Sequence, residues 1–338
     1  EYSGACAGCG ETPYLTNLTR VFSNNLIIAN ATGCSSIYGG TAPSTPYSIP
    51  WASSLFEDNA EYGYGILIGI NLKRAQIKKY MEEYPNNKTF KKWLENMNDY
   101  DICSKVVNEI DYKKHPYLLD MQDYILPKSV WIIGGDGFAY DIGYSGLDHV
   151  LSKNENINIL VLDTEVYSNT GGQSSKSSNY GSIASFTSKG KDNYKKDLAR
   201  IAMCYPHVYV ATTNIGYNKE QYLKVLKEAS EYKGPSLIIA YCPCIEHGIK
   251  TGMEHSQSNA YLATSCGYFL TFRYNPYTKK LIIDSKDPDF SRYEEYLMTE
   301  NRFSSLKNVN KEFADDILND QKNWAIERYN YYKKLSEE

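Results

Sequence analysis

Two glycine-rich segments of the chain carry residues suited to binding a charged cofactor. The first is residues 134–138 (Gly-Gly-Asp-Gly-Phe), and the second is residues 163–173. Glycines let a backbone approach a phosphate closely, and hard oxygen atoms are the ligands that Mg²⁺ prefers. Asp136, the Thr164 hydroxyl or a nearby carbonyl, and the Asn169 amide therefore form a candidate site for Mg²⁺ and a diphosphate.

The elements between these segments predict how they meet. Residues 129–133 and 157–162 are short apolar runs typical of buried strands. Residues 140–151 carry apolar side chains at helical spacing, which predicts a helix whose N-terminal N–H groups and dipole face the first segment. Parallel strands joined by a helix end at the same edge of a sheet. We therefore expect both segments at one carboxyl edge.

A structural interpretation of the first segment is also open. A lone Gly-Asp-Gly is more often a pair of ordinary turns after core strands than a cofactor site. The second segment favours the cofactor site over ordinary turns; its sequence is Asp-Thr-Glu-Val-Tyr-Ser-Asn-Thr-Gly-Gly-Gln.

Five of the eight cysteines lie in loops that can hold a metal centre. They are Cys6 and Cys9 among glycines, Cys34 in a second glycine-containing loop, and Cys242 and Cys244 after the apolar run 236–240. That run predicts a strand, so the last pair is expected at the same sheet edge as the diphosphate segments. Spacing alone leaves zinc, an iron–sulfur cluster, a redox dithiol and unrelated buried thiols open.

Two of these alternatives are disfavoured by the sequence around the cysteines. A compact zinc site usually brings a second close pair of Cys or His within a few tens of residues, and none follows Cys34 at that distance. A thioredoxin-like dithiol needs a strand–Cys-x-x-Cys–helix pattern, which does not surround Cys6.

The segment 135–175 resembles the thiamine diphosphate motif. It is similar to the C-terminal thiamine diphosphate domain of the pyruvate:ferredoxin oxidoreductase family. Asn169-Thr170 departs from the wider motif, in which many members have two consecutive Asn, but it matches the Asn-Thr form of this family. The resemblance extends over nearly the whole chain through residues 54–63, 196–200, 234–237 and 284–286.

The resemblance also covers the cysteines and implies a 4Fe–4S cluster beside the thiamine. The implied ligands are Cys6, Cys9, Cys34 and Cys244. Cys242 is an extra thiol two residues from Cys244, so a ligand exchange there is conceivable. The remaining cysteines, Cys103, Cys204 and Cys266, are expected to be buried small hydrophobic residues.

Further site residues are implied by the same resemblance. The Mg²⁺ ligands would be Asp136, Thr164 and the Val166 carbonyl. The residues implied to line the diphosphate are Gly135, Gly137, Phe138, Ser168, Asn169 and Thr170. Glu11 and Cys34 would approach the thiazolium end, and Asn169, which can also hydrogen-bond the substrate, is the candidate catalytic residue. The plainer alternative for Glu11 is a solvated or locally capping carboxylate.

The family implies oxidative decarboxylation of pyruvate with coenzyme A to acetyl-CoA and CO₂, with electrons passing to ferredoxin or flavodoxin. It also implies a homodimer. The aminopyrimidine-activating Glu and the ferredoxin-like domain of this family are not recognised here, so we expect a fragment of a larger multidomain enzyme that is inactive alone. The alternatives are the same domain of a pyruvate:NADP⁺ oxidoreductase, fused to a flavin reductase, and a zinc-stabilised α/β scaffold module.

Composition agrees with this interpretation. Residues 1–338 are expected to form one α/β domain with a doubly wound, mostly parallel sheet. The net charge of −4 gives no electrostatic footprint for nucleic acid, and no apolar run approaches the length of a membrane span. Thiolate ligation of iron implies a reducing compartment, either the cytoplasm or a reducing anaerobic organelle.

The order of elements divides the chain into regions. Residues 1–70 are expected to form short strands and loops, 72–120 a helical insertion, and 255–338 a C-terminal extension whose last helix is an arm on a neighbour. Between these regions the predicted strands are 129–134, 157–162, 207–212 and 236–241, and the predicted helices are 140–151, 193–203 and 218–230. The final helix is predicted over 314–335.

Overall fold

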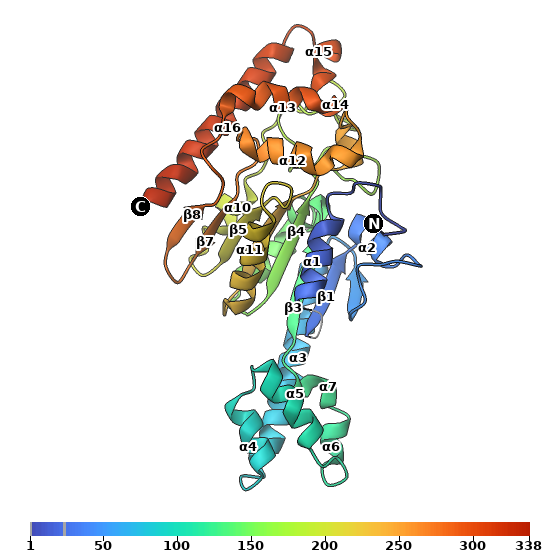
Figure 1. Ribbon diagram of the computed structural model, residues 1–338, viewed down its shortest axis with the longest axis vertical. Coiled ribbons are helices and arrows are strands. Elements are labelled where there is room, and N and C mark those ends of the chain that lie inside the picture. Colours follow the sequence, from blue (N-terminus) through green and yellow to red (C-terminus); the bar gives the residue numbers. More distant parts are fainter. Residues whose placement is uncertain (1, 23–24) are drawn as a thin grey trace.

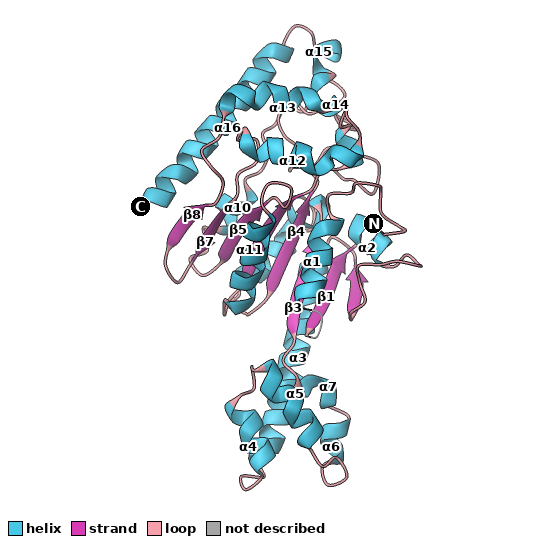
Figure 2. Cartoon of the chain, viewed as in Figure 1, coloured by secondary structure: helices cyan, strands magenta, loops and turns pink. Residues whose placement is uncertain are grey.

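One eight-stranded sheet runs through the protein, for which a computed structural model describes residues 2–22 and 25–338 (Figures 1 and 2). The strands are β1 (Leu26–Ala31), β2 (Trp51–Ser54), β3 (Ser129–Gly134), β4 (Asn158–Asp163), β5 (Tyr209–Thr213), β6 (Ser236–Tyr241), β7 (Phe272–Asn275) and β8 (Lys280–Ile283). Their order is β2-β1-β3-β4-β6-β5-β7-β8. The pairs from β2 to β5 are parallel, and β7 and β8 add an antiparallel edge. The predicted mostly parallel α/β sheet is confirmed.

Helices cover both faces of this sheet, as a doubly wound fold requires. One face is covered by α1 (Thr12–Phe22) and α11 (Lys219–Glu231), and the other by α3 (Asn59–Glu82), α9 (Tyr144–Leu151) and α16 (Ala314–Glu337). Alternate residues of β3 serve the two cores: Trp131 and Ile133 on one face, and Val130 and Ile132 on the other. Burial on both faces explains why the central strands are near-continuous apolar runs.

The predicted strands after residue 128 and the helix at 218–230 are confirmed to within two residues. The helix predicted over 193–203 is wrong in length, because α10 spans only Leu198–Ala202. Asp197 ends the preceding loop as the N-cap residue, and its side chain accepts a hydrogen bond from the Arg200 N–H.

The helix predicted over 140–151 is also wrong at its start. The structure has a single turn, α8 (Asp136–Ala139), and then α9 from Tyr144. Ile142, assigned to the apolar face, is 62% exposed in the connection. A single helical turn therefore begins within the Gly-Asp-Gly segment, at Asp136. The long helix that was expected to direct its dipole at this segment is not formed there.

The expectation of only strands and loops over residues 1–70 is wrong. This region contains α1, α2 (Cys34–Gly39) and the first half of α3 besides its two strands. Three glycines of α3 obscure the helical pattern in the sequence. Gly63 has a packing reason, because a Cβ there would lie 2.4 Å from Ile132 Cγ1. The helix can cross the sheet this closely only without a side chain.

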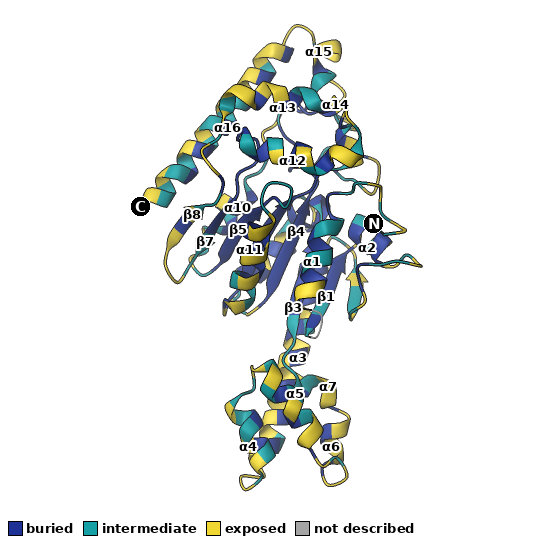
Figure 3. Cartoon of the chain, in the orientation of Figure 1, coloured by how far each residue is buried: buried dark blue, intermediate teal, exposed yellow. Residues whose placement is uncertain are grey.

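A group of helices lies at the far end of α3, in the region predicted to be a helical insertion (Figure 1). It consists of α4 (Lys88–Glu95), α5 (Tyr100–Glu109), α6 (Pro116–Leu119) and α7 (Gln122–Ile125), so it continues past residue 120. A separate core holds it together, including Ile77, Met81, Phe90 and Trp93. Its outer surface is largely exposed (Figure 3).

The region 255–338 does more than extend the chain. It supplies β7 and β8 to the main sheet, while α12 (Ser256–Ser265), α13 (Tyr293–Thr299), α14 (Asn301–Ser304) and α15 (Leu306–Val309) lie beyond the sheet (Figure 2). The predicted final helix is confirmed as α16. Its buried face packs on this chain, with the Tyr332 and Phe272 rings 4.4 Å apart. The division into one domain, an insertion and an extension stays a prediction.

Within residues 2–22 and 25–338, no helix is both long enough and apolar enough to cross a bilayer.

Replacing Gly63 by Ala tests the close crossing of α3 over β3. A matched control is Gly65→Ala on the same helix, because a Cβ at Gly65 would meet no atom within 4 Å. Both changes gain about 1 kcal/mol of helix propensity, and only Gly63→Ala overpacks the core, at a cost of about 1–3 kcal/mol. We expect the free energy of unfolding in urea to be lower for Gly63→Ala than for Gly65→Ala by that overpacking cost. Equal values would contradict the close contact.

Candidate functional site

A cavity opens at the carboxyl ends of β1, β3 and β4. The chain leaves β1 for β2 on one side, and β3 lies on the other side of β1. Loops that diverge in this way leave a crevice at the carboxyl edge, which is where open α/β sheets bind ligands. The sheet topology therefore places the cavity.

Nearly all predicted cofactor-binding residues line this cavity. They are Glu11, Cys34, Gly135, Asp136, Gly137, Phe138, Ser168, Asn169 and Thr170. Thr164 is the exception and lies buried next to the cavity wall, in contact with Val166, which does line it. Asn169 and Thr170 have exposed side chains. The structure brings the set together, and the individual roles stay predictions.

Asp136 is a buried carboxylate with one oxygen free. Its side chain is 3% exposed, and Oδ2 accepts a hydrogen bond from Ser175 Oγ at 2.5 Å. No described residue bonds Oδ1. Burial, and then the charge of Asp163, raise the pKa of Asp136 well above its usual range. A buried polar atom without a partner at the wall of a polar cavity fits a cation ligand.

Two further oxygens face each other near the same cavity. Thr164 Oγ1 donates to the Val166 carbonyl at 3.0 Å. The residue between them, Glu165, has φ of 61°, a left-handed conformation unusual for a residue with a side chain. This turn brings a hydroxyl and a carbonyl together at the end of β4, next to the strand that carries Asp136. The donor set is of the type that Mg²⁺ takes.

The backbone next to Asp136 also fits a diphosphate. A Cβ built on Gly135 would meet only the Leu162 carbonyl, at 3.7 Å, so the space over this backbone is open. A phosphate can approach it closely for that reason.

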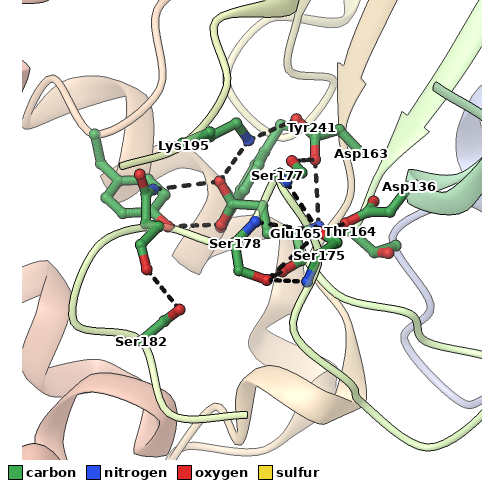
Figure 4. A network of polar contacts seen from close by, with 12 residues as sticks. Asp136, Asp163, Thr164, Glu165, Ser175, Ser177, Ser178, Ser182, Lys195 and Tyr241 are labelled. Carbon is green, nitrogen blue, oxygen red and sulfur yellow. Dashed lines mark hydrogen bonds and ion pairs between the residues drawn. The ribbon is translucent and has the colours of Figure 1, made fainter. Parts of the chain in front are cut away.

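Buried charges hold the turn at Glu165 (Figure 4). Lys195 Nζ lies 2.8 Å from Glu165 Oε1 and 2.6 Å from Asp163 Oδ2. Arg302 and the Tyr268 hydroxyl contact the other oxygen of Glu165, at 2.7 and 2.6 Å. Burial alone would raise the pKa of Glu165, but Lys195 and Arg302 hold it well below its usual range. The carboxylate is therefore charged and anchored.

A serine segment links the three acidic positions (Figure 4). Ser175 donates to Asp136, Ser177 donates to Asp163 Oδ1, and Ser178 donates to the Glu165 carbonyl. The buried Lys191 ammonium in turn donates to the carbonyls of Ser175 and Ser178, at 2.9 and 2.6 Å. Sequence reasoning gave no role to these serines or to Lys191, Lys195 and Arg302. The only signal was the run of serines directly after the motif.

The first cysteine loop packs against the last one. Gly10 N–H donates to the Pro243 carbonyl at 3.0 Å, and a Cβ at Gly10 would lie 2.5 Å from Pro243 N. Only glycine allows this approach, which brings the loop of Cys6 and Cys9 beside Cys244. Cys34 joins them from the cavity wall, with its Sγ 3.4 Å from Ser168 Oγ.

Cys9, Cys34 and Cys244 are partly buried, and Cys6 is exposed. Burial raises the pKa of Cys9 and of Cys34 to about 12, and the neighbouring Glu11 contributes to both shifts. Burial, and then Glu11, Cys34 and Cys9, raise the pKa of Cys244. Thiols kept neutral in this way need a metal centre to become thiolates. In the described part of the chain, no three Cys, His, Asp or Glu side chains are grouped to hold a single metal ion.

Cys242 and Cys244 differ in their surroundings. Cys242 is fully buried, packs within the core of α1 and α11, and its thiol donates to the Ala240 carbonyl at 3.3 Å. Cys244 is partly exposed. The prediction that Cys103 and Cys266 are buried is confirmed, but for Cys204 it is wrong, because that side chain is exposed on α10's C-terminal side.

Glu11 lies in the wall between the cavity and the cysteines. It is 4% exposed, and its Oε2 accepts a hydrogen bond from the Tyr38 hydroxyl at 3.0 Å. Burial raises the pKa of Glu11 to about 7. The alternative of a solvated carboxylate is wrong.

Comparison with known proteins agrees with this geometry. Residues 122–240 match the family described as thiamine pyrophosphate enzyme, C-terminal TPP binding domain. All of the chain aligns with pyruvate:ferredoxin oxidoreductase of Moorella thermoacetica at 45% identity and with pyruvate-flavodoxin oxidoreductase of Klebsiella pneumoniae at 42%, covering 31% of each. It also aligns in full with the mitochondrial pyruvate dehydrogenase (NADP⁺) of Euglena gracilis at 42%, covering 20% of that protein.

The chain thus spans about a third or less of the length of these relatives. Among solved structures, a chain of 2-oxoglutarate:ferredoxin oxidoreductase from Magnetococcus marinus gives a TM-score of 0.49 at 18% identity, covering 72% of this chain and 64% of that one.

Lys195→Met tests the buried ion pairs under the site. It leaves Asp163 and Glu165 without their shared cation, and removing one partner of a buried pair typically costs about 3–5 kcal/mol. We expect urea unfolding to show a loss of this size. The matched control, Lys176→Met, removes an ammonium that lies 3.1 Å from Asp141 on a side chain that is 66% exposed. It should cost less than about 1 kcal/mol, because Asp141 keeps the hydrogen bond from the Lys176 backbone N–H. Similar small losses in both variants would show that Lys195 does not hold the acidic residues.

Proposed function

We propose that this chain forms the cofactor-binding part of a pyruvate:ferredoxin or pyruvate-flavodoxin oxidoreductase. It is related to these enzymes over its whole length, and residues 122–240 match a thiamine pyrophosphate-binding domain. The enzyme decarboxylates pyruvate oxidatively with coenzyme A, giving acetyl-CoA and CO₂. Its electrons leave through a 4Fe–4S cluster to ferredoxin or flavodoxin.

One observation carries this proposal. Cys34 both lines the cavity of the diphosphate segments and lies near Cys9 and Cys6. A thiamine cofactor in the cavity and a cluster on the cysteines would therefore be neighbours. Thiamine diphosphate supplies stabilisation of the carbanion formed on decarboxylation, and a cluster supplies a one-electron acceptor.

The residues that follow β3 and β4 at the cavity would hold the Mg²⁺ and the diphosphate. Asp136 Oδ1, Thr164 Oγ1 and the Val166 carbonyl are the Mg²⁺ ligands. The open backbone at Gly135 and the polar side chains of Ser168, Asn169 and Thr170 bind the phosphates, and Gly137 and Phe138 complete the wall.

The reactive end of the cofactor would lie toward Glu11 and Cys34. Glu11 is held by Tyr38 and can keep or release a proton near neutral pH, since its pKa is raised to about 7. Asn169 presents its amide at the exposed side of the cavity, where it can hydrogen-bond the substrate. Cys6, Cys9, Cys34 and Cys244 hold the cluster.

The full enzyme would contain further domains and act as a homodimer in the cytoplasm or in a reducing organelle. A second candidate is a pyruvate:NADP⁺ oxidoreductase, in which a fused flavin reductase accepts the electrons. This second candidate is supported by the similarity to the NADP⁺ enzymes of Euglena gracilis and Cryptosporidium parvum, at 42% and 38% identity. A flavodoxin-like sequence after this segment in the full-length protein would decide for it.

Asp136→Asn in the full-length enzyme tests the metal–diphosphate site. The amide keeps the shape but removes the anionic ligand. Removing a residue that only supports a metal ligand typically costs about 10- to 100-fold in metal affinity. Because Asp136 is itself the proposed ligand, we expect Mg²⁺-dependent binding of thiamine diphosphate to be more than about 100-fold weaker by titration calorimetry.

Asp148→Asn is the matched control for this measurement. Asp148 lies on α9 and does not line the cavity, and its carboxylate accepts a hydrogen bond from the Tyr205 hydroxyl at 3.0 Å. It should bind the cofactor normally. Normal binding by Asp136→Asn would contradict the assignment.

Cys244→Ala and Cys242→Ala test which thiol of the pair holds iron. Because the Cys242 thiol is buried in the core and Cys244 adjoins the Gly10–Pro243 contact, we expect loss of the cluster only in Cys244→Ala. Iron content and electron paramagnetic resonance of the reduced, anaerobically purified proteins give the answer. The reverse pattern would show that Cys242 is the ligand.

A further inference from the structure

We propose that His247 is a positioning residue that ties the loop of Cys244 to the backbone of Thr164, and so fixes the cluster loop against the Mg²⁺–diphosphate loop. The inference rests on the proposed function, since it is that function which gives the two loops their roles. It concerns a residue that does not line the cavity.

His247 lies where two neighbouring strands separate. The β4–β6 ladder ends with Asp163 opposite Tyr241, followed by a bond from Cys242 N–H to the Asp163 carbonyl at 2.9 Å. Beyond this point the loops diverge, so the Thr164 carbonyl has no strand partner. His247 Nε2 takes that place at 2.7 Å. The imidazole therefore continues the link between β4 and β6 past the end of the sheet.

The other ring nitrogen faces the cysteine loop. His247 ends the short helix η1 (Ile245–His247), whose N-cap is Cys244. Cys244 N–H donates to His247 Nδ1 at 3.4 Å, and His247 N–H donates back to the Cys244 carbonyl at 3.0 Å. The ring thus bonds a proposed cluster ligand on one side and a proposed Mg²⁺ ligand on the other.

These two contacts require one form of the ring. A carbonyl only accepts hydrogen bonds, so Nε2 must carry the proton that Thr164 receives. A backbone N–H only donates, so Nδ1 must offer a lone pair to Cys244. The neutral ring with its proton on Nε2 satisfies both. Glu300 Oε1 lies 3.7 Å from Nδ1, too far for a hydrogen bond, and Arg302 binds that carboxylate at 2.7 Å.

Both ends of the link are held by their surroundings. Gly248, directly after His247, has φ of 63°, and its carbonyl accepts from Asn301 N–H at 2.9 Å. On the other side, the Thr164 carbonyl belongs to the peptide that leads into Glu165, whose carboxylate Lys195 and Arg302 anchor. His247 is fully buried, so the ring cannot turn away into solvent.

Two variants separate the two ring contacts. In His247→Gln the terminal amide nitrogen can reach the position of Nε2 and donate to Thr164. In His247→Asn the side-chain oxygen can replace Nδ1 and accept from Cys244, but the side chain is too short to reach Thr164. A buried carbonyl left without its donor costs on the order of a tenfold change in an equilibrium.

The measurement is the Kd of thiamine diphosphate with saturating Mg²⁺, by titration calorimetry on the full-length protein, together with iron content. We expect roughly tenfold weaker binding in His247→Asn and near-wild-type binding in His247→Gln, with wild-type iron content in both. His247→Met fills the same space without a donor and is expected to bind as weakly as His247→Asn, so rescue by Gln alone is the outcome that a merely space-filling role would not give.

Two outcomes would overturn the proposal: unchanged affinity in His247→Asn, or a loss in His247→Gln as large as in His247→Asn. If near-ultraviolet circular dichroism shows that His247→Asn does not fold, His247→Gln decides alone, because a tenfold loss in that variant overturns the link and wild-type affinity supports it. A failure of the proposed function looks different, since the wild-type protein itself would then bind neither thiamine diphosphate nor iron.

Discussion

The charge arrangement under the β4 loop is the constraint on which the site depends. Lys195 is shared by Asp163 and Glu165, and Arg302 is shared by Glu165 and Glu300, all of them buried. Buried ions are tolerated only when paired, because each loses its hydration. Asp136 is close enough to Asp163 for its pKa to be raised, yet it receives only a serine hydroxyl. The pairs leave one carboxylate oxygen without a counter-charge, and that oxygen lies at the cavity wall.

Backbone geometry adds to this electrostatic arrangement. The left-handed conformation of Glu165 costs roughly 1–2 kcal/mol for a residue with a side chain, and such conformations persist when their surroundings over-determine them. Here Lys195, Arg302 and Tyr268 hold the side chain, Ser178 bonds the carbonyl, and the turn sets Thr164 Oγ1 against the Val166 carbonyl. The oxygens are therefore already arranged before any cation binds.

The sequence predicted those parts of this arrangement that local pattern determines. Near-continuous apolar runs mark β3, β4 and β6 in the sequence. The glycines and Asp136 directly follow the first of these runs, so they can be identified from the sequence alone. Most residues expected at the cofactor site line one cavity because they lie in loops at the shared carboxyl edge of the sheet, and their roles stay predictions. What failed depends on contacts distant in sequence: Gly63 needs Ile132, and Lys195 and Arg302 meet Glu165 only after folding. The antiparallel pair β7–β8 was missed because short edge strands are only half buried and carry a weak pattern.

The same distinction explains why the two proposed cofactor sites cannot be separate modules. Cys6 and Cys9 precede α1, Cys34 follows β1, and Cys244 follows β6, so no segment of the chain holds the thiols by itself. Their loops lie at one edge because β1, β3, β4 and β6 are neighbours in a parallel sheet and their carboxyl ends share that edge. The diphosphate loops follow β3 and β4, the two strands between β1 and β6. A sheet in this order therefore places the loops after β3 and β4 between the loops that follow β1 and β6. The separation of the two proposed cofactor sites would then be set by the spacing of the strands.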